Sequence, residues 1–401
     1  MRLQLKVHKI ALVAFAIAFA GIAKAIGLGS VSNAMLILGA FSFLVQFGLQ
    51  FRLSSRLAIP VVFLTAYLMI YLVLTASAPT AAGMKNTVSI FVGAMFFLFG
   101  AINAEKLAFG ASCQNIFFVT AVFCAVLAPS LGDTNKNAIS GISMYMLLVS
   151  GAILVHRKRL DRFPALLAFA TVYIVGQMLG HRMAVASGII GALVYFSLIF
   201  LPFQTIRRIL LSVVTASILL LVAMYTGLWD LNIRDSNDLF VAVSGRNAVS
   251  GRQIIWPIIV NAVSASKFTG LGTGMSFSNL YNSDWSAHSL YMQVYLQTGF
   301  LGLGFLVLAL WSIWWCIGKP RRRDTMSAYA SATMTVVILH SATEVYLTQV
   351  NLMIGALAWL TLGLCIGLIN LQRKPNNTRE TNTICNETDL PPSIHQQCRA
   401  N

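Results

Sequence analysis

Apolar runs of about twenty residues, separated by short polar stretches, recur along most of the chain. As a helix, a run of this length crosses the hydrocarbon core of a bilayer, which is about 30 Å thick. The pattern predicts an all-α, multi-pass membrane protein with about 12 transmembrane helices. The predicted segments are residues 9–27, 33–50, 57–76, 87–103, 114–131, 138–155, 163–179, 183–203, 209–228, 289–317, 326–347 and 352–371.

Two polar regions interrupt or follow this pattern. The first covers about residues 229–288 and separates the ninth predicted segment from the tenth. The second covers residues 372–401, where polar residues and prolines are typical of a disordered tail. We therefore expect a transmembrane domain over residues 1–371 that carries one large loop. The first apolar run lacks a convincing cleavage site, so we interpret it as a first span.

Composition supports the membrane class and argues against nucleic-acid binding. The 401 residues are 57% hydrophobic and 10% charged, whereas soluble proteins carry about 25% charged residues. The net charge of +16 comes from basic residues scattered over short loops. Nucleic-acid binding instead requires a continuous basic patch or stripe.

The basic residues also predict how the chain is oriented in the membrane. With the N-terminus in the cytoplasm, about 20 lysines and arginines fall on the cytoplasmic side and about 7 on the outer side. Both termini and the tail are then cytoplasmic, and the loop at about residues 229–288 faces outward. None of the cysteines lies in a predicted outer loop, so no structural disulfide is expected.

The tenth predicted segment, residues 289–317, is too long for one simple span. As a continuous helix it would measure about 43 Å at about 1.5 Å per residue, against a hydrocarbon core of about 30 Å. Glycines at positions 299, 302 and 304 lie near the excess. We expect a separate helical stretch over His288–Thr298 at the outer interface.

Arg182 lies between two apolar segments on the predicted outer side, directly after His181. An arginine at such depth costs about 2.5–3.5 kcal/mol unless it meets water or a partner. It either snorkels to the interface or forms an anion site that faces a cavity. The scarcity of basic residues on the outer side favours the anion site.

Arg246 and Arg252 lie six residues apart in the large predicted loop. Each is either a solvated loop charge or part of an anion site. Arginine binds phosphate oxygens through two parallel hydrogen bonds and stays charged. Two or three arginines on the outer face would suit a lipid-linked diphosphate.

His288 is the best candidate for a general base, because imidazole titrates near neutrality. A structural role for a single histidine beside a span stays open. Ser289, Tyr291 and Gln293 follow it and offer groups suited to sugar hydroxyls, or they form an amphipathic interface. His340 and Glu344 share a helix face near the outer end of the eleventh segment and could pair with an arginine or line a cavity. No acidic or His/Cys cluster on the outer side indicates a metal site, and no cofactor is expected.

These residues resemble the O-antigen ligase and O-antigen polymerase family of bacterial envelope enzymes. The family signature is a His followed by Asn, Ser or Gln, then nine residues, Gly, two residues and Gly. His288-Ser289, Gly299 and Gly302 match it, Arg252 with the following Ile and Trp256 matches the family's loop arginine, and Arg182 matches its mid-chain arginine. The chain departs from the family at His181, where Ser is usual, and at Ala186, where Leu is frequent.

The resemblance implies a type C-like glycosyltransferase in the bacterial inner membrane, with residues 1–371 as the catalytic domain and the active site facing the periplasm. Its donor would be a glycan on undecaprenyl diphosphate, and no metal is required. Arg182 and Arg252, with Arg246 nearby, would bind the diphosphate, and His288 would accept the proton of the acceptor hydroxyl. A chain-length regulator and a flippase are partners that this resemblance implies.

The acceptor separates two versions of this reaction. A polymerase of O-antigen, capsule or exopolysaccharide uses another lipid-linked repeat unit, and a ligase uses the lipid A core. The Ala-His-Ser-x-Tyr and Gly-Arg-x-x-Ile-Trp patterns look more like the polymerases. A transporter of lipid-linked sugar is the alternative from another class. Transporters typically show repeated halves and midplane ionisable residues, whereas this chain has its notable charges at the predicted outer face.

Overall fold

The computed structural model describes residues 2–48, 55–109, 111–127, 136–158, 162–200, scattered positions between 205 and 216, and residues 252–281, 285–317, 324–347 and 351–373. Throughout these ranges the regular structure is helical, without a β-strand. The chain divides into two units, residues 1–369 and 370–401. Every contact discussed below lies within the first unit. Of the tail predicted over residues 372–401, residues 372 and 373 end α15, and the rest lies outside the described residues.

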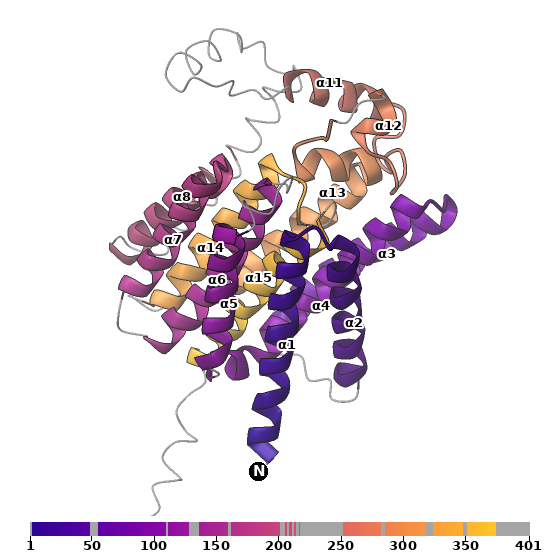
Figure 1. The fold of residues 1–401 in the computed structure, drawn as a ribbon. Helices are drawn as coiled ribbons and strands as arrows, with labels where there is room; N and C mark the ends of the chain where they lie inside the picture. Colours follow the sequence, from indigo (N-terminus) through magenta and orange to yellow (C-terminus); the bar gives the residue numbers. More distant parts are fainter. Residues whose placement is uncertain are drawn as a thin grey trace, which may run out of the picture. The chain divides into compact units, whose positions relative to one another are not determined.

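The helices, labelled in Figure 1, are α1 (Arg2–Ala25), α2 (Gly29–Gly48), α3 (Ser55–Ser77), α4 (Ala81–Phe109), α5 (Ala111–Leu127), α6 (Lys136–Arg157), α7 (Phe163–Leu179), α8 (Arg182–Phe200), α11 (Arg252–Val263), α12 (Phe277–Tyr281), α13 (Leu290–Ile317), α14 (Thr325–Thr343) and α15 (Leu352–Arg373). Eleven of the predicted apolar segments coincide with one of these helices. The ninth, residues 209–228, lies mostly outside the described residues.

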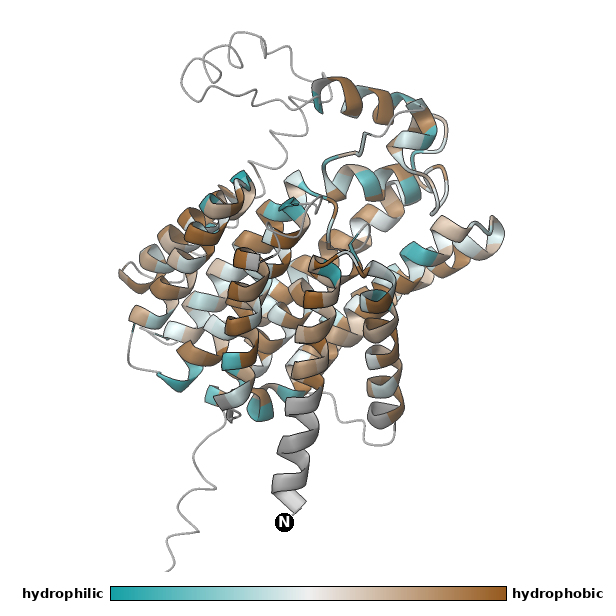
Figure 2. Ribbon diagram, viewed as in Figure 1, coloured by the Kyte–Doolittle hydropathy of each residue, from teal (hydrophilic) through white to brown (hydrophobic). Residues whose placement is uncertain are grey.

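Six of the described helices are long and apolar enough to cross a membrane: α3, α4, α6, α8, α13 and α15. Shorter apolar stretches lie in α1, α2, α5, α7 and α11. In Figure 2 hydrophobic residues cover most of the length of these helices. The protein is therefore an all-helical, membrane-embedded, multi-pass protein. The number of spans and the side that each loop faces stay predictions.

Some helices that follow each other in the chain pack together, and helices distant in sequence also meet. α7 packs on α8, α5 on α6, and α14 on both α6 and α8, while α13 packs on α3 and on α14 (Figure 1). α15 is almost entirely buried and approaches α4 closely. Side chains at Gly363 and Gly367 would collide with the carbonyls of Phe97 and Ala101, so glycine permits this close approach of the two backbones.

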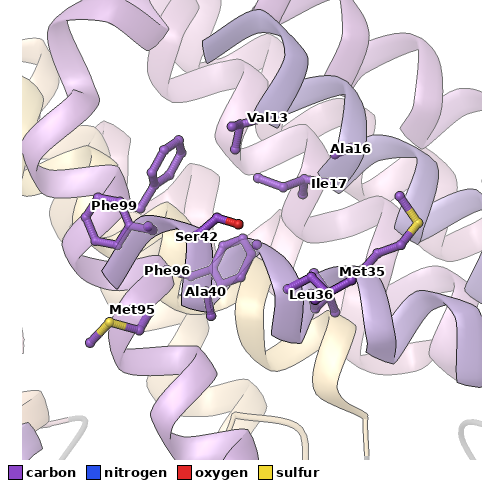
Figure 3. A pocket seen from close by; sticks show the side chains of 13 residues that line it. Val13, Ala16, Ile17, Met35, Leu36, Ala40, Ser42, Met95, Phe96 and Phe99 are labelled. Carbon is purple, nitrogen blue, oxygen red and sulfur yellow. The ribbon is translucent and has the colours of Figure 1, made fainter. Parts of the chain in front are cut away.

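A cavity of about 320 Å³ lies between α1, α2 and α4. Figure 3 shows its lining, which includes Ile17 from α1, Met35 and Leu36 from α2, and Phe96 from α4. Apart from the Ser42 hydroxyl the lining side chains are apolar. With no titratable group around it, this cavity offers no acid–base chemistry.

α13 bends at Gly299, where the backbone adopts φ 60° and ψ −156°. The bend falls where the length of the predicted segment required a break. Before the bend, residues 290–298 lie next to the stretch that follows α11. The amides of Leu271 and Gly272 there donate to the carbonyls of Leu296 and Gln297, at 2.9 and 3.1 Å. This bend directs the start of α13, and the His288 that precedes it, toward α11.

Candidate functional site

Three segments distant in sequence meet around the guanidinium of Arg252, the first residue of α11. Its Nε donates to the carbonyl oxygen of His288 at 3.3 Å, and its Nη2 donates to the carbonyl oxygen of Thr343 at 3.0 Å. Thr343 ends α14, and Glu344 follows as its C-cap. The structure therefore brings together Arg252, His288 and Glu344, three of the residues that the sequence indicated.

The hydrogen bonds that Arg252 donates from Nε and Nη2 lie on one edge of its guanidinium. Charge-assisted hydrogen bonds of this kind contribute about 1.5–3 kcal/mol each. The Thr343 carbonyl belongs to the last turn of α14, where the helix dipole places partial negative charge and a cation is stabilising. The arginine thus stabilises the end of α14 while it places positive charge beside His288.

His288 is held in an unusual backbone conformation. Its φ is 47°, and in the described part of the chain no other residue except glycine has a positive φ. Its amide donates to Ser286 Oγ at 3.3 Å. Residues other than glycine adopt this conformation at a cost of about 1–3 kcal/mol, and such strain is concentrated at functional sites.

The imidazole of His288 is half-buried, and no hydrogen bond joins it to the described residues. Burial lowers its pKa below the ordinary value of 6.5, and the positive charge of Arg252 lowers it further. The ring is therefore neutral near pH 7. A neutral imidazole can accept a proton, which is what a general base must do.

Glu344 is the second group that can exchange a proton near neutrality. Burial raises the pKa of its carboxyl to about 7, although the positive charge of Arg252 acts in the opposite direction. Glu344 directly follows α14, and its main-chain amide donates to the carbonyl of His340 at 2.9 Å. An acid, a base and a fixed cation therefore share one small region.

A second polar cluster, which we call the histidine cluster, surrounds His340 in the last turn of α14. It consists of His340, His181, Tyr145 and Tyr346. Tyr145 Oη lies 3.0 Å from His340 Nδ1, and the His340 ring is 6.1 Å from the His181 ring and 5.4 Å from the Tyr346 ring, between centroids. Both histidines are buried, and neither ring nitrogen of His181 has a partner among the described residues. Burial lowers the pKa of His181 to about 4, so its ring is neutral.

Arg182 begins α8 and is exposed. It follows a tight turn in which Gly180 adopts a left-handed conformation, with φ 66°, and the His181 amide donates to the Gly176 carbonyl at 2.9 Å. The neighbouring His181 places this turn beside the end of α14 through the histidine cluster. Arg246 lies outside the described residues.

Ser289, Tyr291 and Gln293 are buried, and their polar groups bond to the chain itself. Ser289 Oγ accepts from the Met292 amide at 3.5 Å and so caps the start of α13. Tyr291 Oη donates to the Ile338 carbonyl at 3.2 Å, and Gln293 Nε2 donates to the Met275 carbonyl at 2.8 Å. A contact of these side chains with a sugar would require them to exchange these partners.

The glycines of the sequence signature serve backbone packing. The amides of Phe300 and Leu301 donate to the carbonyls of Lys267 and Phe268, at 2.8 and 3.1 Å. A side chain at Gly299 would collide with those carbonyls, and a side chain at Gly302 would collide with Thr298. The nine residues between Ser289 and Gly299 are therefore the helical stretch that joins the cap of α13 to its bend.

Two contacts near the site were not predicted from the sequence. Trp256, named there only as part of the Arg252 motif, donates from Nε1 to the Ala287 carbonyl at 2.8 Å, and its spacing of four residues from Arg252 is a signal that could have found this role. Tyr145, which meets His340 across a separation of 195 residues, has no comparable signal. Among the described residues no group of three His, Cys, Asp or Glu side chains could hold a metal ion.

Comparison with known proteins does not assign a function to this site. No protein-family model matches the chain, and no curated protein matches it either. The candidate function therefore rests on the residues and contacts described above.

Proposed function

We propose that this protein is a membrane glycosyltransferase that takes a glycan from undecaprenyl diphosphate at the periplasmic face of the bacterial inner membrane. The acceptor in this proposal is a second lipid-linked repeat unit, so that the product is O-antigen, capsule or exopolysaccharide. The observation that carries the proposal is the contact of Arg252 with the main chain of His288 and of Thr343, next to Glu344. A cation beside a neutral imidazole is the pair of groups that the proposed reaction uses.

In the proposed reaction His288 accepts the proton of the acceptor hydroxyl while that oxygen attacks the anomeric carbon of the donor sugar. The bond between the anomeric carbon and the diphosphate oxygen breaks, and undecaprenyl diphosphate leaves with the electron pair. Arg252 and Arg182 stabilise the negative charge that develops on the leaving group. The neutral state of the His288 imidazole near pH 7, which follows from its lowered pKa, supports its role as the proton acceptor.

Purified protein in detergent, supplied with a lipid-linked glycan, tests the proposal. We expect release of undecaprenyl diphosphate together with a lengthened glycan in the parent, and a loss of both products in His288→Ala by about 10²–10⁴-fold. The same donor offered with lipid A core separates the ligase from the polymerase. A protein that moves the donor across vesicles without releasing diphosphate would be a transporter, and the proposed reaction would then be wrong.

The proposed orientation has its own test. A reporter fused after Asn279, in α12 between α11 and α13, should be active in the periplasm. A second reporter fused after Lys374 should be active in the cytoplasm. A cytoplasmic signal from the Asn279 fusion would place Arg252 and His288 on the wrong side for a periplasmic donor and would refute the mechanism.

A further inference from the structure

Two side chains of α11 hold the residues just before α13. Arg252 and Trp256 are one helical turn apart, so they lie on the same face of the helix. Trp256 Nε1 donates to the Ala287 carbonyl at 2.8 Å, and Arg252 Nε donates to the His288 carbonyl at 3.3 Å. The two acceptors are consecutive carbonyls of the main chain.

The segment held in this way, residues 285–289, contains the strained position. We call it the His288 loop. A positive φ at a non-glycine residue persists only where the surroundings impose it. Here the His288 amide donates to Ser286, and Ser289 caps α13 on the following side. The two donors from α11 fix the carbonyls on either side of the His288 α-carbon, and so they constrain the conformation that directs its imidazole.

The same arginine connects the His288 loop to α14. Its second hydrogen bond, at 3.0 Å to the Thr343 carbonyl, ends one residue before Glu344. Trp256 is completely buried, so α11 is packed into the protein interior at this point. The distance between the imidazole and the carboxyl therefore depends on α11.

We propose that α11 is a positioning element, in which Trp256 acts through the Ala287 carbonyl to fix the backbone of His288. Trp256 touches neither substrate nor reacting atoms in this proposal, so it is a positioning residue. The clamp itself, meaning the hold of Trp256 and Arg252 on the His288 loop, is independent of the reaction. Its consequence for transfer rests on the proposed function.

Hydrogen–deuterium exchange of Trp256→Phe tests the clamp. Phenylalanine keeps an aromatic ring in the buried position and removes the N–H donor. Trp359→Phe is the matched control, because Trp359 is equally buried and its Nε1 donates to the Leu347 carbonyl at 2.9 Å. We expect the amides of residues 288–293 to exchange about fivefold faster in Trp256→Phe, as the loss of one hydrogen bond implies. They should be unchanged in Trp359→Phe.

Unchanged exchange in Trp256→Phe, or an equal increase in the Trp359→Phe control, would overturn the clamp. Glycan transfer supplies a second readout. With the clamp weakened, kcat should fall by about tenfold or more while the KM for the lipid-linked donor is kept, because misplacement of a catalytic group lowers the rate of the chemical step. Faster exchange with unchanged kcat would overturn the positioning role. A parent without transfer activity would refute the proposed function, and exchange alone would then decide whether the clamp exists.

Discussion

Gly299→Ala tests whether the bend in α13 depends on the absence of a side chain. Gly299 has φ 60° and ψ −156°, a region that is essentially restricted to glycine. An added methyl group would lie 2.5 Å from the Phe268 carbonyl carbon and 2.6 Å from its oxygen. These are backbone atoms, so the collision is not relieved by rotation of a side chain.

The expected cost has two physical parts. Forcing a residue with a side chain into this conformation costs about 1–3 kcal/mol. Moving residues 267–268 away weakens the hydrogen bonds from Phe300 and Leu301, each of which contributes about 1 kcal/mol. The free energy of unfolding should therefore fall by about 3–5 kcal/mol, which is large for a single methyl group.

Gly304→Ala is the control, because an added methyl group there meets nothing within 4 Å and the residue lies in the same helix. Alanine should stabilise that position by up to about 1 kcal/mol. Thermal unfolding of the purified proteins in one detergent gives the comparison. If Gly299→Ala unfolds at the temperature of the parent or of Gly304→Ala, then the bend does not require glycine and this account of the signature is wrong.

Three further predictions concern the groups around Arg252. Arg252→Lys should recover little of the activity lost in Arg252→Ala, because an ammonium group cannot span the two carbonyls; glycan transfer in both variants measures this. His288→Gln should be about as inactive as His288→Ala, since an amide cannot accept the proton, and a fully active variant would end the assignment. The pH profile of glycan transfer shows which residue is the base, because a base must be deprotonated to act. If His288 is the base, activity should rise with pH below 6.5, both in the parent and in Glu344→Gln. If Glu344 is the base, activity should rise near pH 7, and Glu344→Gln should abolish that rise.

The sequence alone determined the helices and one of their irregularities. Runs of apolar residues predict helices because a backbone in lipid must satisfy its hydrogen bonds internally, and eleven of the twelve predicted runs coincide with a described helix. The excess length of segment 289–317 predicted a break, which falls at Gly299. The sequence also indicated Arg252 and His288 as candidate functional residues, because charged groups and imidazoles are scarce in this chain.

Tertiary packing decided what those residues contact. Arg252 meets the Thr343 carbonyl across 91 residues, and His340 meets Tyr145 across 195, so periodicity within one helix carries no information about either pair. Gln293 and Tyr291 belong to a polar sequence that suits sugar binding, yet their side chains bond to Met275 and Ile338 carbonyls. Buried polar groups take whichever partner the packed helices bring within reach. The packing of α14 against α6 and α13 brought His340 to Tyr145 and Tyr291 to Ile338, and the sequence did not reveal it.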